Sequence, residues 1–412
     1  MKNKFLSEIK SRGYLNQCTN LSGLEELCNK SGIVGYIGFD CTASSLHVGS
    51  LLQIMILKLM QKFGHRPIVL LGGGTTLIGD PSGKDSTRKV LKKDEIENNI
   101  KNIKKVFYKI LDFSKEETKP IFVNNDEWLS KLNYIKFLRE IGCHFTINKM
   151  LTFDSVKIRL EREQSLSYME FNYMILQAFD FYQLFKKKNC VLQIGGSDQW
   201  GNIVNGIELI RRILDSEAFG ITSPLITLAS GAKMGKTEKG AIWLNDDLLP
   251  AYDYWQFWRN TDDRDVKRFL LYFTELDVEK IDEITESEKN INKLKIILAN
   301  EATKILHGEE LAKKSEKTAK ETFEGKGSGE SLPEIKVESS ELKKGLDLLD
   351  FLNKNKITPS KSEARRVISN KGLRINNDII SDEKKKIKLD DFKNKILKIS
   401  FGKKKHYIVK II

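Results

Sequence analysis

Hydrophobic residues in this chain form short continuous runs that alternate with longer helical patterns. Three runs, Val34–Phe39, Pro67–Leu71 and Ile121–Asn124, are short and apolar, as is typical of buried strands. Between the first two, residues 51–64 (LLQIMILKLMQKFG) have an apolar pattern long enough for a helix. Strand, long helix and strand make a βαβ unit, so we predict an α/β fold with a doubly wound parallel sheet and ligands at the strands' carboxyl ends.

The chain of 412 residues is too long for one ordinary core, and its patterns divide it into parts. The α/β pattern occupies residues 1–240, and residues 241–323 are mostly helical and charged. Residues 324–344 are Gly/Ser-rich and polar, which predicts a linker. Residues 345–412 predict a small α+β domain, with a helix capped by Ser360 and a hairpin turn at 376–378.

Composition excludes several classes of protein. The five cysteines are scattered and contain no CxxC pair, which argues against a disulfide framework and a structural zinc site. No run of 18 apolar residues occurs, and the first residues lack the apolar core of a signal peptide. We therefore expect a cytoplasmic protein with no membrane partner.

The positive charge of the chain is concentrated at one end. The formal net charge is +13, and residues 341–412 hold 20 lysines and arginines against 9 acidic residues. A concentrated basic domain favours a polyanionic partner, most simply a nucleic acid. A lysine-rich solvated surface would look the same by charge alone.

Residues 36–50 (YIGFDCTASSLHVGS) predict a strand, a turn and the start of a helix. The free N–H groups and positive dipole at a helix start form an anion site. Gly49 permits close approach of a ligand to the backbone, and His47 can donate a hydrogen bond to a phosphate. Alone, His47 could equally be a capping or packing residue.

A second candidate is the glycine-flanked loop SGAKMGKTEKG, residues 230–240. Lys233 and Lys236 lie three apart and can reach one polyphosphate as compact charges. A solvated surface loop is the alternative interpretation.

The stretch SLSYMEFNYMILQAFDFYQLF, residues 165–185, predicts an apolar helix with polar positions on one face. Tyr173, Gln177 and Asp180 lie four and three apart, so they share that face and need partners if they are buried. A core helix with satisfied polar residues is the alternative. The strand at 190–195 then ends in a glycine turn that contains Gly196, Asp198 and Gln199.

Residues 72–88 (GGGTTLIGDPSGKDSTR) could be mistaken for a phosphate-binding P-loop. The P-loop pattern needs a glycine where Ile78 stands and Ser or Thr where Asp85 stands, so we reject it. The glycines at 72–74 more simply let the chain turn tightly under a ligand. Asp80 alone would suit a plain turn.

Taken together, these motifs resemble a known family. HVGS is similar to the HIGH motif and KMGKT to the KMSKS motif of class I aminoacyl-tRNA synthetases. GFDCTASSLHVGSL, GGGTTLIGDPSGK, YMEFNYMILQAFDF and LQIGGSDQWGNI narrow the resemblance to bacterial-type tyrosyl-tRNA synthetases. It covers nearly the whole chain. SKSEARRVI and GLRIN resemble a small RNA-binding domain named after a ribosomal small-subunit protein.

The resemblance implies a Rossmann-like catalytic domain, an α-helical domain near the tRNA anticodon and the small RNA-binding domain. It implies activation of L-tyrosine with ATP and transfer to the 3′ end of tRNA(Tyr). The partners would be tRNA(Tyr), L-tyrosine, ATP and a second copy in a homodimer. ATP with Mg²⁺ would be a substrate, with no bound prosthetic group and no protein metal site.

The same resemblance assigns the site residues. Tyrosine would contact Tyr36, Asp40, Asp80, Tyr173, Gln177, Asp180 and Gln199. The nucleoside and phosphates of ATP would contact His47, Gly49, Ser50, Gly196, Asp198 and Lys236. Thr42, Lys84, Arg88, Lys233 and Thr237 would complete the phosphate site. RNA phosphates would contact Lys361, Arg365, Arg366, Lys371 and Arg374.

Three positions depart from the family pattern. Ser50 replaces the second His of HIGH, and its hydroxyl can still hydrogen-bond the ribose. Cys41 replaces the usual Pro, and we interpret it as a packing residue. Gly235 stands where KMSKS has Ser.

Other functions stay open from the residues alone. The tryptophan enzyme of the same superfamily is one, although Asp180 paired with Tyr36 argues against an indole, which offers only a donor N–H. A non-catalytic RNA-binding protein with a degenerate nucleotide fold is another, and the lysine loop and the 165–185 helix argue against it. A simple nucleotidyltransferase would have no use for the C-terminal RNA module.

Overall fold

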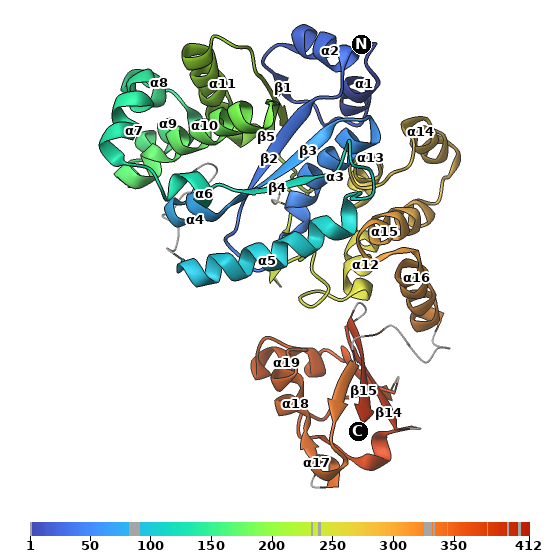
Figure 1. Cartoon of the computed structure of the whole chain (residues 1–412). Helices are drawn as coiled ribbons and strands as arrows, with labels where there is room; N and C mark the ends of the chain where they lie inside the picture. The colour runs from blue at the N-terminus through green and yellow to red at the C-terminus, as the bar shows by residue number, and fades with distance from the viewer. Residues whose placement is uncertain are drawn as a thin grey trace. The chain divides into compact units, whose positions relative to one another are not determined.

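The computed structural model describes residues 2–81, 91–231, 234–237, 240–324, 332, 334–343, 345–376, 378–393, 395–402 and 405–412. They form two compact units (Figure 1). The first comprises residues 1–249 and 257–307, and the second comprises residues 250–256 and 308–412. The division falls within helix α12 (Ala251–Arg259).

A mixed sheet forms the centre of the first unit, in the order β1-β6-β5-β2-β3-β4. All neighbours are parallel except β1, which is antiparallel to β6. After β2 the chain adds β3 and then β4 on one side of β2. It then crosses to the other side of β2, where it adds β5 and then β6, so the strand order reverses between β2 and β5. Such a switch point is where α/β sheets bind ligands. The strands are β1 (Gln17–Cys18), β2 (Val34–Asp40), β3 (Arg66–Gly72), β4 (Ile121–Asn124), β5 (Cys190–Gly196) and β6 (Phe219–Ser223).

Helices cover both faces of this sheet (Figure 1). Alternate strand side chains point to opposite faces. On one face Tyr36 and Ile68 pack in one core cluster with Phe181 of α10 (Tyr168–Lys188) and Leu209 of α11 (Trp200–Leu214). On the other face Phe39 of β2 and Phe122 of β4 both contact Phe107 of α5 (Lys93–Ile110). The predicted doubly wound α/β fold is confirmed.

The predicted helix after β2 is α3, and two short helices, α1 and α2, precede β2. The glycines at 72–74 were predicted to form a tight turn; instead, Gly72 ends β3, and Gly73 and Gly74 begin the short helix α4. The helices of this part are α1 (Lys4–Ser11), α2 (Leu21–Lys30), α3 (Val48–Lys62), α4 (Gly73–Ile78), α5 (Lys93–Ile110), α6 (Asp126–Leu129), α7 (Tyr134–Glu140), α8 (Ile147–Met150), α9 (Asp154–Glu161), α10 (Tyr168–Lys188) and α11 (Trp200–Leu214).

Helices α13 (Val266–Phe273), α14 (Val278–Ser287) and α15 (Ile291–His307) belong to the same unit as the sheet. α13 packs on α3, and α15 packs on α5 and α13. The short strands β7 (Lys236–Thr237) and β8 (Gly240–Ala241) pair with each other beside the N-terminus of α3.

The second unit contains α16 (Glu309–Glu324) and a sheet in the order β12-β11-β14-β15-β9. Its strand β9 (Glu334–Val337) and helix α17 (Ser339–Lys343) lie in the stretch predicted as a linker. Ser360 caps α19 as predicted, because its side chain accepts a hydrogen bond from the Glu363 N–H. The other elements are β10 (Leu346–Asp347), α18 (Leu348–Lys354), α19 (Lys361–Ser369), β11 (Leu373–Ile375), β12 (Asp378–Ile379), β13 (Lys386–Ile387), β14 (Ile396–Phe401) and β15 (Lys405–Ile411).

Within the described residues, no helix combines the length and hydrophobicity that crossing a bilayer requires.

Candidate active site

A cavity of about 280 Å³ lies at the carboxyl ends of β2 and β5, where the strand order reverses. Most of the residues predicted for the tyrosine and nucleoside sites come together in its wall. They are Tyr36, Asp40, Gly49, Ser50, Asp80, Tyr173, Gln177, Asp180, Gly196, Asp198 and Gln199.

Two polar side chains mark one end of the cavity, and both are almost completely buried. Asp180 of α10 accepts hydrogen bonds from Trp128 Nε1 at 2.7 Å and from Asn125 Nδ2 at 2.8 Å. Tyr36 of β2 has a buried hydroxyl with no hydrogen-bond partner among the described residues. A ligand with a hydroxyl group can satisfy both side chains here.

The electrostatics of this end follow from burial. Burial raises the pKa of Asp180 to about 7, although hydrogen bonds from Asn125 and Trp128 oppose the shift. Burial, followed by the nearby Asp180 carboxylate, raises the pKa of Tyr36 well above its usual range. Tyr36 is therefore a neutral donor, and Asp180 titrates near neutral pH.

Two further carboxylates, Asp40 and Asp80, lie in the cavity wall and are held there by hydrogen bonds from polar side chains. Asp40 accepts hydrogen bonds from Thr75 Oγ1 at 2.8 Å and from Tyr173 Oη at 3.1 Å. Asp80 accepts one from Gln199 Nε2 at 2.9 Å. Asn202 links this set to the α10 helix face by donating to Gln177 Oε1 at 3.0 Å. Carboxylates and hydroxyls of this kind suit an ammonium group.

Gly72 makes the close approach of β2 and β3 possible at this point. A Cβ atom on Gly72 would lie 2.4 Å from Asp40 Oδ1 and 2.5 Å from Thr75 Oγ1. Any larger residue would displace the Asp40 carboxylate from the cavity wall.

The third part of the cavity surrounds the end of β5. A Cβ atom on Gly196 would lie 2.6 Å from Asp198 Oδ1 and 3.3 Å from Leu225, so only glycine leaves this surface open. Ser50 and Gln53 of α3 line the same cavity. Gln53 donates to Ser223 Oγ at 2.7 Å, while its buried Oε1 has no partner among the described residues.

The HVGS and KMGKT segments lie against each other at the N-terminus of α3. His47 is the N-cap of this helix, because its Nδ1 accepts a hydrogen bond from the Gly49 N–H at 3.0 Å. Gly235 has φ +97°, and a Cβ atom there would lie 2.5 Å from His47 Nδ1. The Val48 N–H donates to the Ile242 carbonyl at 2.9 Å, and the Ile242 N–H donates to the Gly235 carbonyl at 3.2 Å, so Ile242 joins the two segments.

Some predicted phosphate-site residues are not brought into the cavity wall. Thr42 is exposed and, like His47, is absent from the described lining. Lys84, Arg88 and Lys233 lie outside the described residues. For Lys236 and Thr237 the structure describes the backbone, as strand β7.

The predicted RNA-contact residues of the second unit are all exposed on or next to α19 and β11. Arg365 pairs with Glu383 at 3.6 Å and Arg366 with Glu363 at 2.8 Å. Lys361 pairs with Asp350. Solvent-exposed ion pairs of this kind are weak, so the basic groups can exchange partners readily. The others are Lys371 and Arg374.

Sequence reasoning missed polar residues that line the cavity, among them Gln53, Thr75, Asn125 and Gln193, and also Trp128, which donates to Asp180. Asn125 follows β4, and a polar residue after a parallel strand was a usable signal. Gln53 lies one turn after Ser50 on the same helix face, so its position could have been inferred. Thr75 and Trp128 gave no signal, since their roles depend on contacts with distant residues.

A family model described as "tRNA synthetases class I (W and Y)" matches residues 29–324, which is more than half of the chain. The switch-point cavity and the paired motifs at its rim are therefore those of a class I tRNA synthetase. A second model, "Tyrosine--tRNA ligase SYY-like C-terminal domain", matches residues 326–409.

Curated relatives narrow the family further. The chain is 61% identical to "Tyrosine--tRNA ligase" of Pelagibacter ubique over 100% of both chains, and 53% identical to that of Bartonella quintana over 99% of both. A solved structure, a C-terminally truncated mitochondrial tyrosyl-tRNA synthetase of Aspergillus nidulans, aligns with TM-score 0.70 and 27% identity over 78% of this chain and 94% of that one. This chain belongs to the tyrosine–tRNA ligase family.

Proposed function

We propose that this chain charges tRNA(Tyr): it activates L-tyrosine with ATP and transfers the tyrosyl group to the 3′ end of the tRNA. The observation that carries the proposal is the buried pair of Tyr36 and Asp180. A phenolic hydroxyl can donate to Asp180 and accept from Tyr36. Phenylalanine in the same place would leave both groups unpaired, which is strongly unfavourable.

The rest of the cavity orients the amino acid. Asp80, Tyr173 and Gln177 hold the ammonium group, Asp40 supports Tyr173, and Gln199 reaches the carboxylate. The carboxylate oxygen then attacks the α-phosphorus of ATP, and the bond to pyrophosphate breaks. Positioning supplies much of the rate, because no side chain becomes covalently attached.

Stabilisation of the negative charge on the leaving pyrophosphate supplies the rest of the rate enhancement. Thr42 and His47, beside the positive dipole end of α3, hold the phosphates from one side. Positive side chains close from the other side. We assign this role to Lys84, Arg88, Lys233 and Lys236, with Thr237. ATP enters as its Mg²⁺ complex, and Asp198 with Ser50 holds the ribose.

In the second step a ribose hydroxyl of the tRNA terminus attacks the tyrosyl carbonyl, and AMP leaves. The C-terminal unit supports this step by binding RNA phosphates through Lys361, Arg365, Arg366, Lys371 and Arg374. Such contacts confer salt-dependent affinity and little sequence readout.

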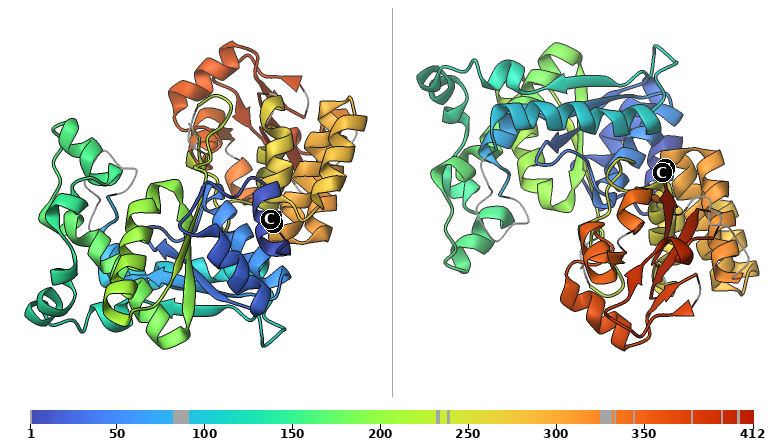
Figure 2. Two further views of the ribbon diagram at one scale, coloured as in Figure 1. Left: turned by 90° about the horizontal axis from the view of Figure 1, so that it is seen from above. Right: turned by 90° about the horizontal axis from the view of Figure 1, so that it is seen from below.

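The active form is a homodimer. Exposed large hydrophobic residues gather on α7–α10: Tyr134, Ile135, Ile147, Leu160 and Tyr168 are each at least half exposed. Both views of Figure 2 show residues 134–161 projecting from one end of the first unit. A second copy of the chain is the occupant that the family resemblance implies for this surface.

The test is tyrosine-dependent exchange of labelled pyrophosphate into ATP, with tryptophan and phenylalanine as controls. Exchange with tyrosine alone is expected. Exchange with tryptophan instead would reassign the amino acid. No exchange with any amino acid, from a folded sample with Mg²⁺, would favour a non-catalytic RNA-binding protein.

A further inference from the structure

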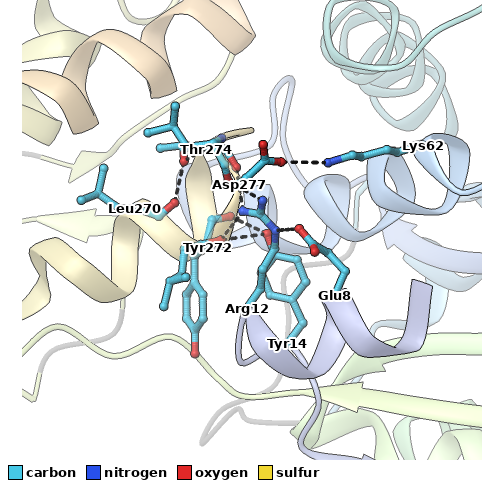
Figure 3. Close-up of polar contacts among 10 residues, drawn as sticks. Glu8, Arg12, Tyr14, Lys62, Leu270, Tyr272, Thr274 and Asp277 are labelled. Carbon is cyan, nitrogen blue, oxygen red and sulfur yellow. Dashed lines mark hydrogen bonds and ion pairs between the residues drawn. The ribbon is translucent and has the colours of Figure 1, made fainter. Parts of the chain in front are cut away.

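Helix α13 is held at its C-terminal end by the N-terminal segment of the chain. The Arg12 guanidinium is almost completely buried and donates to the carbonyls of Leu271 at 2.9 Å, Thr274 at 3.0 Å and Leu276 at 2.6 Å. Figure 3 shows Arg12 between helix α1 and this end of α13, with Glu8 bonded to its Nε. The last carbonyls of a helix lack partners within it, so a buried cation is well placed here.

Tyr14 adds a second tie to the same end. Its buried hydroxyl donates to the Tyr272 carbonyl at 2.8 Å, and its ring contacts the ring of Tyr272. A more exposed ion pair, Lys62 with Asp277 at 3.7 Å, lies just beyond (Figure 3). Arg12 and Tyr14 thus fix α13, whereas Lys62 joins two solvated surfaces.

The N-terminal end of α13 holds the segment that leads into the lysine loop. Asp265, which is buried, accepts a hydrogen bond from the Ala229 N–H at 2.8 Å. Arg268 donates to the Thr227 carbonyl and to Asp265, both at 2.5 Å. The Met234 N–H in turn donates to the Ile226 carbonyl at 3.1 Å. Residues 226–229, here called the loop stem, are therefore anchored to α13.

A short helix can transmit this restraint. With eight residues α13 is about 12 Å long and stiff along its axis. Its buried side chains include Phe269 and Phe273, and the helix packs on α3. His47 is the N-cap of α3. The loop stem and the N-terminus of α3 are therefore both connected to α13, the first by hydrogen bonds and the second through the packing of α3 on α13.

We infer that Arg12 and Asp265 are positioning residues for adenylate formation: through α13, the N-terminal segment sets the place of the loop stem relative to the N-terminus of α3. The inference rests on the proposed function, in which Lys233 and Lys236 stabilise the leaving pyrophosphate. A displacement of about 1 Å at such a site can cost up to about 100-fold in rate.

The test compares Arg12→Met, Asp265→Asn and the double variant in tyrosine-dependent pyrophosphate exchange, with tyrosine affinity measured separately by titration calorimetry. Each single change is expected to lower kcat about 10-fold and leave the tyrosine Kd within about 2-fold. The double variant should lose much less than the product of the two, because each change releases the same helix. Arg12→Lys, which keeps the charge, should recover part of the rate.

Controls separate positioning from damage to the fold. Lys62→Met removes the exposed ion pair nearby and should leave kcat unchanged. If Arg12→Met does not fold, Tyr14→Phe, which removes one hydrogen bond to the same end of α13, replaces it. Unchanged kcat, multiplicative losses, or a tyrosine Kd that rises with the loss of rate would each overturn the inference. A wild-type chain without exchange would instead reject the proposed function.

Discussion

At the end of the cavity formed by Tyr36 and Asp180, single polar residues are buried at the expense of folding stability. A buried Tyr36 hydroxyl without a partner among the described residues lowers the stability of the ligand-free chain. Burial also keeps the pKa of Asp180 near 7, which means that its charged form is disfavoured there. A phenolic hydroxyl would relieve both penalties, so in the proposed function the same atoms that weaken the ligand-free protein select the ligand.

Removal of the Tyr36 hydroxyl tests this argument. Tyr36→Phe should weaken tyrosine binding about 3- to 10-fold, the effect of one neutral hydrogen bond, and raise the unfolding free energy of the ligand-free chain by up to about 1 kcal/mol. Calorimetric titration and denaturant unfolding measure the two quantities. Tyr182→Phe, on the same helix as Asp180 but outside the described lining, should change neither. Wild-type tyrosine affinity in Tyr36→Phe would contradict the assignment.

His65 makes the stability of the first unit depend on pH. It is buried, its Nδ1 accepts a hydrogen bond from the Ile33 N–H at 3.2 Å, and its ring lies 4.7 Å from that of Phe5. Burial lowers the pKa of His65 from 6.5 to about 4. The folded state therefore keeps the imidazole neutral where the unfolded chain would already bind a proton.

Stability from His65 is fully present above pH 6.5 and is lost as the pH falls toward 4. The unfolding free energy should fall by about 2 kcal/mol between pH 7 and pH 5 through this residue. Denaturant unfolding of wild type and His65→Gln at both values measures it. Since the other groups titrate equally in both proteins, the difference in unfolding free energy between wild type and His65→Gln should be smaller at pH 5 than at pH 7. A constant difference would show that His65 does not titrate as described.

At the scale of elements, helix α10 presents chemistry that its sequence spacing predicted. Tyr173, Gln177 and Asp180 all reach the cavity wall from one face. The helix begins with a capping box in which Ser167 and Glu170 exchange hydrogen bonds, and buried Glu170 also pairs with Arg159 at 3.0 Å. A well-fixed helix start holds these three side chains in place along the cavity wall.

Helix α19 offers a corresponding test in the second unit. Arg365→Gln with Arg366→Gln should weaken tRNA binding and reduce the slope of log K against log salt by about 1.5. Fluorescence anisotropy at salt concentrations from about 50 to about 200 mM, where phosphate contacts strongly affect affinity, would measure the tRNA dissociation constant and its salt dependence. Pyrophosphate exchange, which needs no tRNA, should not change. Lys336→Gln on β9 is the control, and an unaltered slope in the double variant would exclude α19 from the interface.

At the scale of the whole molecule, the proposed dimer depends on the apolar surface on α7–α10. Ile135 and Ile147 are 70% and 64% exposed. Changing both to Asp should convert a dimer to a monomer, because charges buried in an interface without partners are strongly unfavourable. Light scattering after size-exclusion chromatography measures the mass. Leu311→Asp on α16, an exposed leucine elsewhere, should leave the dimer intact. A wild-type chain that is monomeric at micromolar concentration would refute the proposal.

Much of the protein followed from sequence alone. Local patterns predicted β2, β3, β4 and β5 and the helix at α10, because strand and helix periodicity are properties of neighbouring residues. The family resemblance predicted many of the polar residues that line the cavity, and the family assignment is confirmed by relatives that match over the full chain. The domain boundaries and the roles of the site residues stay predictions.

Tertiary structure decided what no local pattern encodes. Asn125 and Trp128 hold Asp180, β9 joins the C-terminal sheet from within the expected linker, and Arg12 ends α13. Each contact joins residues far apart in the chain, where neither periodicity nor a motif links the partners. Burial determines what these contacts do. Desolvation raises the pKa of Asp180, and it makes unpaired N–H groups on Arg12 costly, so that the Arg12 hydrogen bonds are required. This desolvation arises only when segments distant in the chain pack around the two side chains.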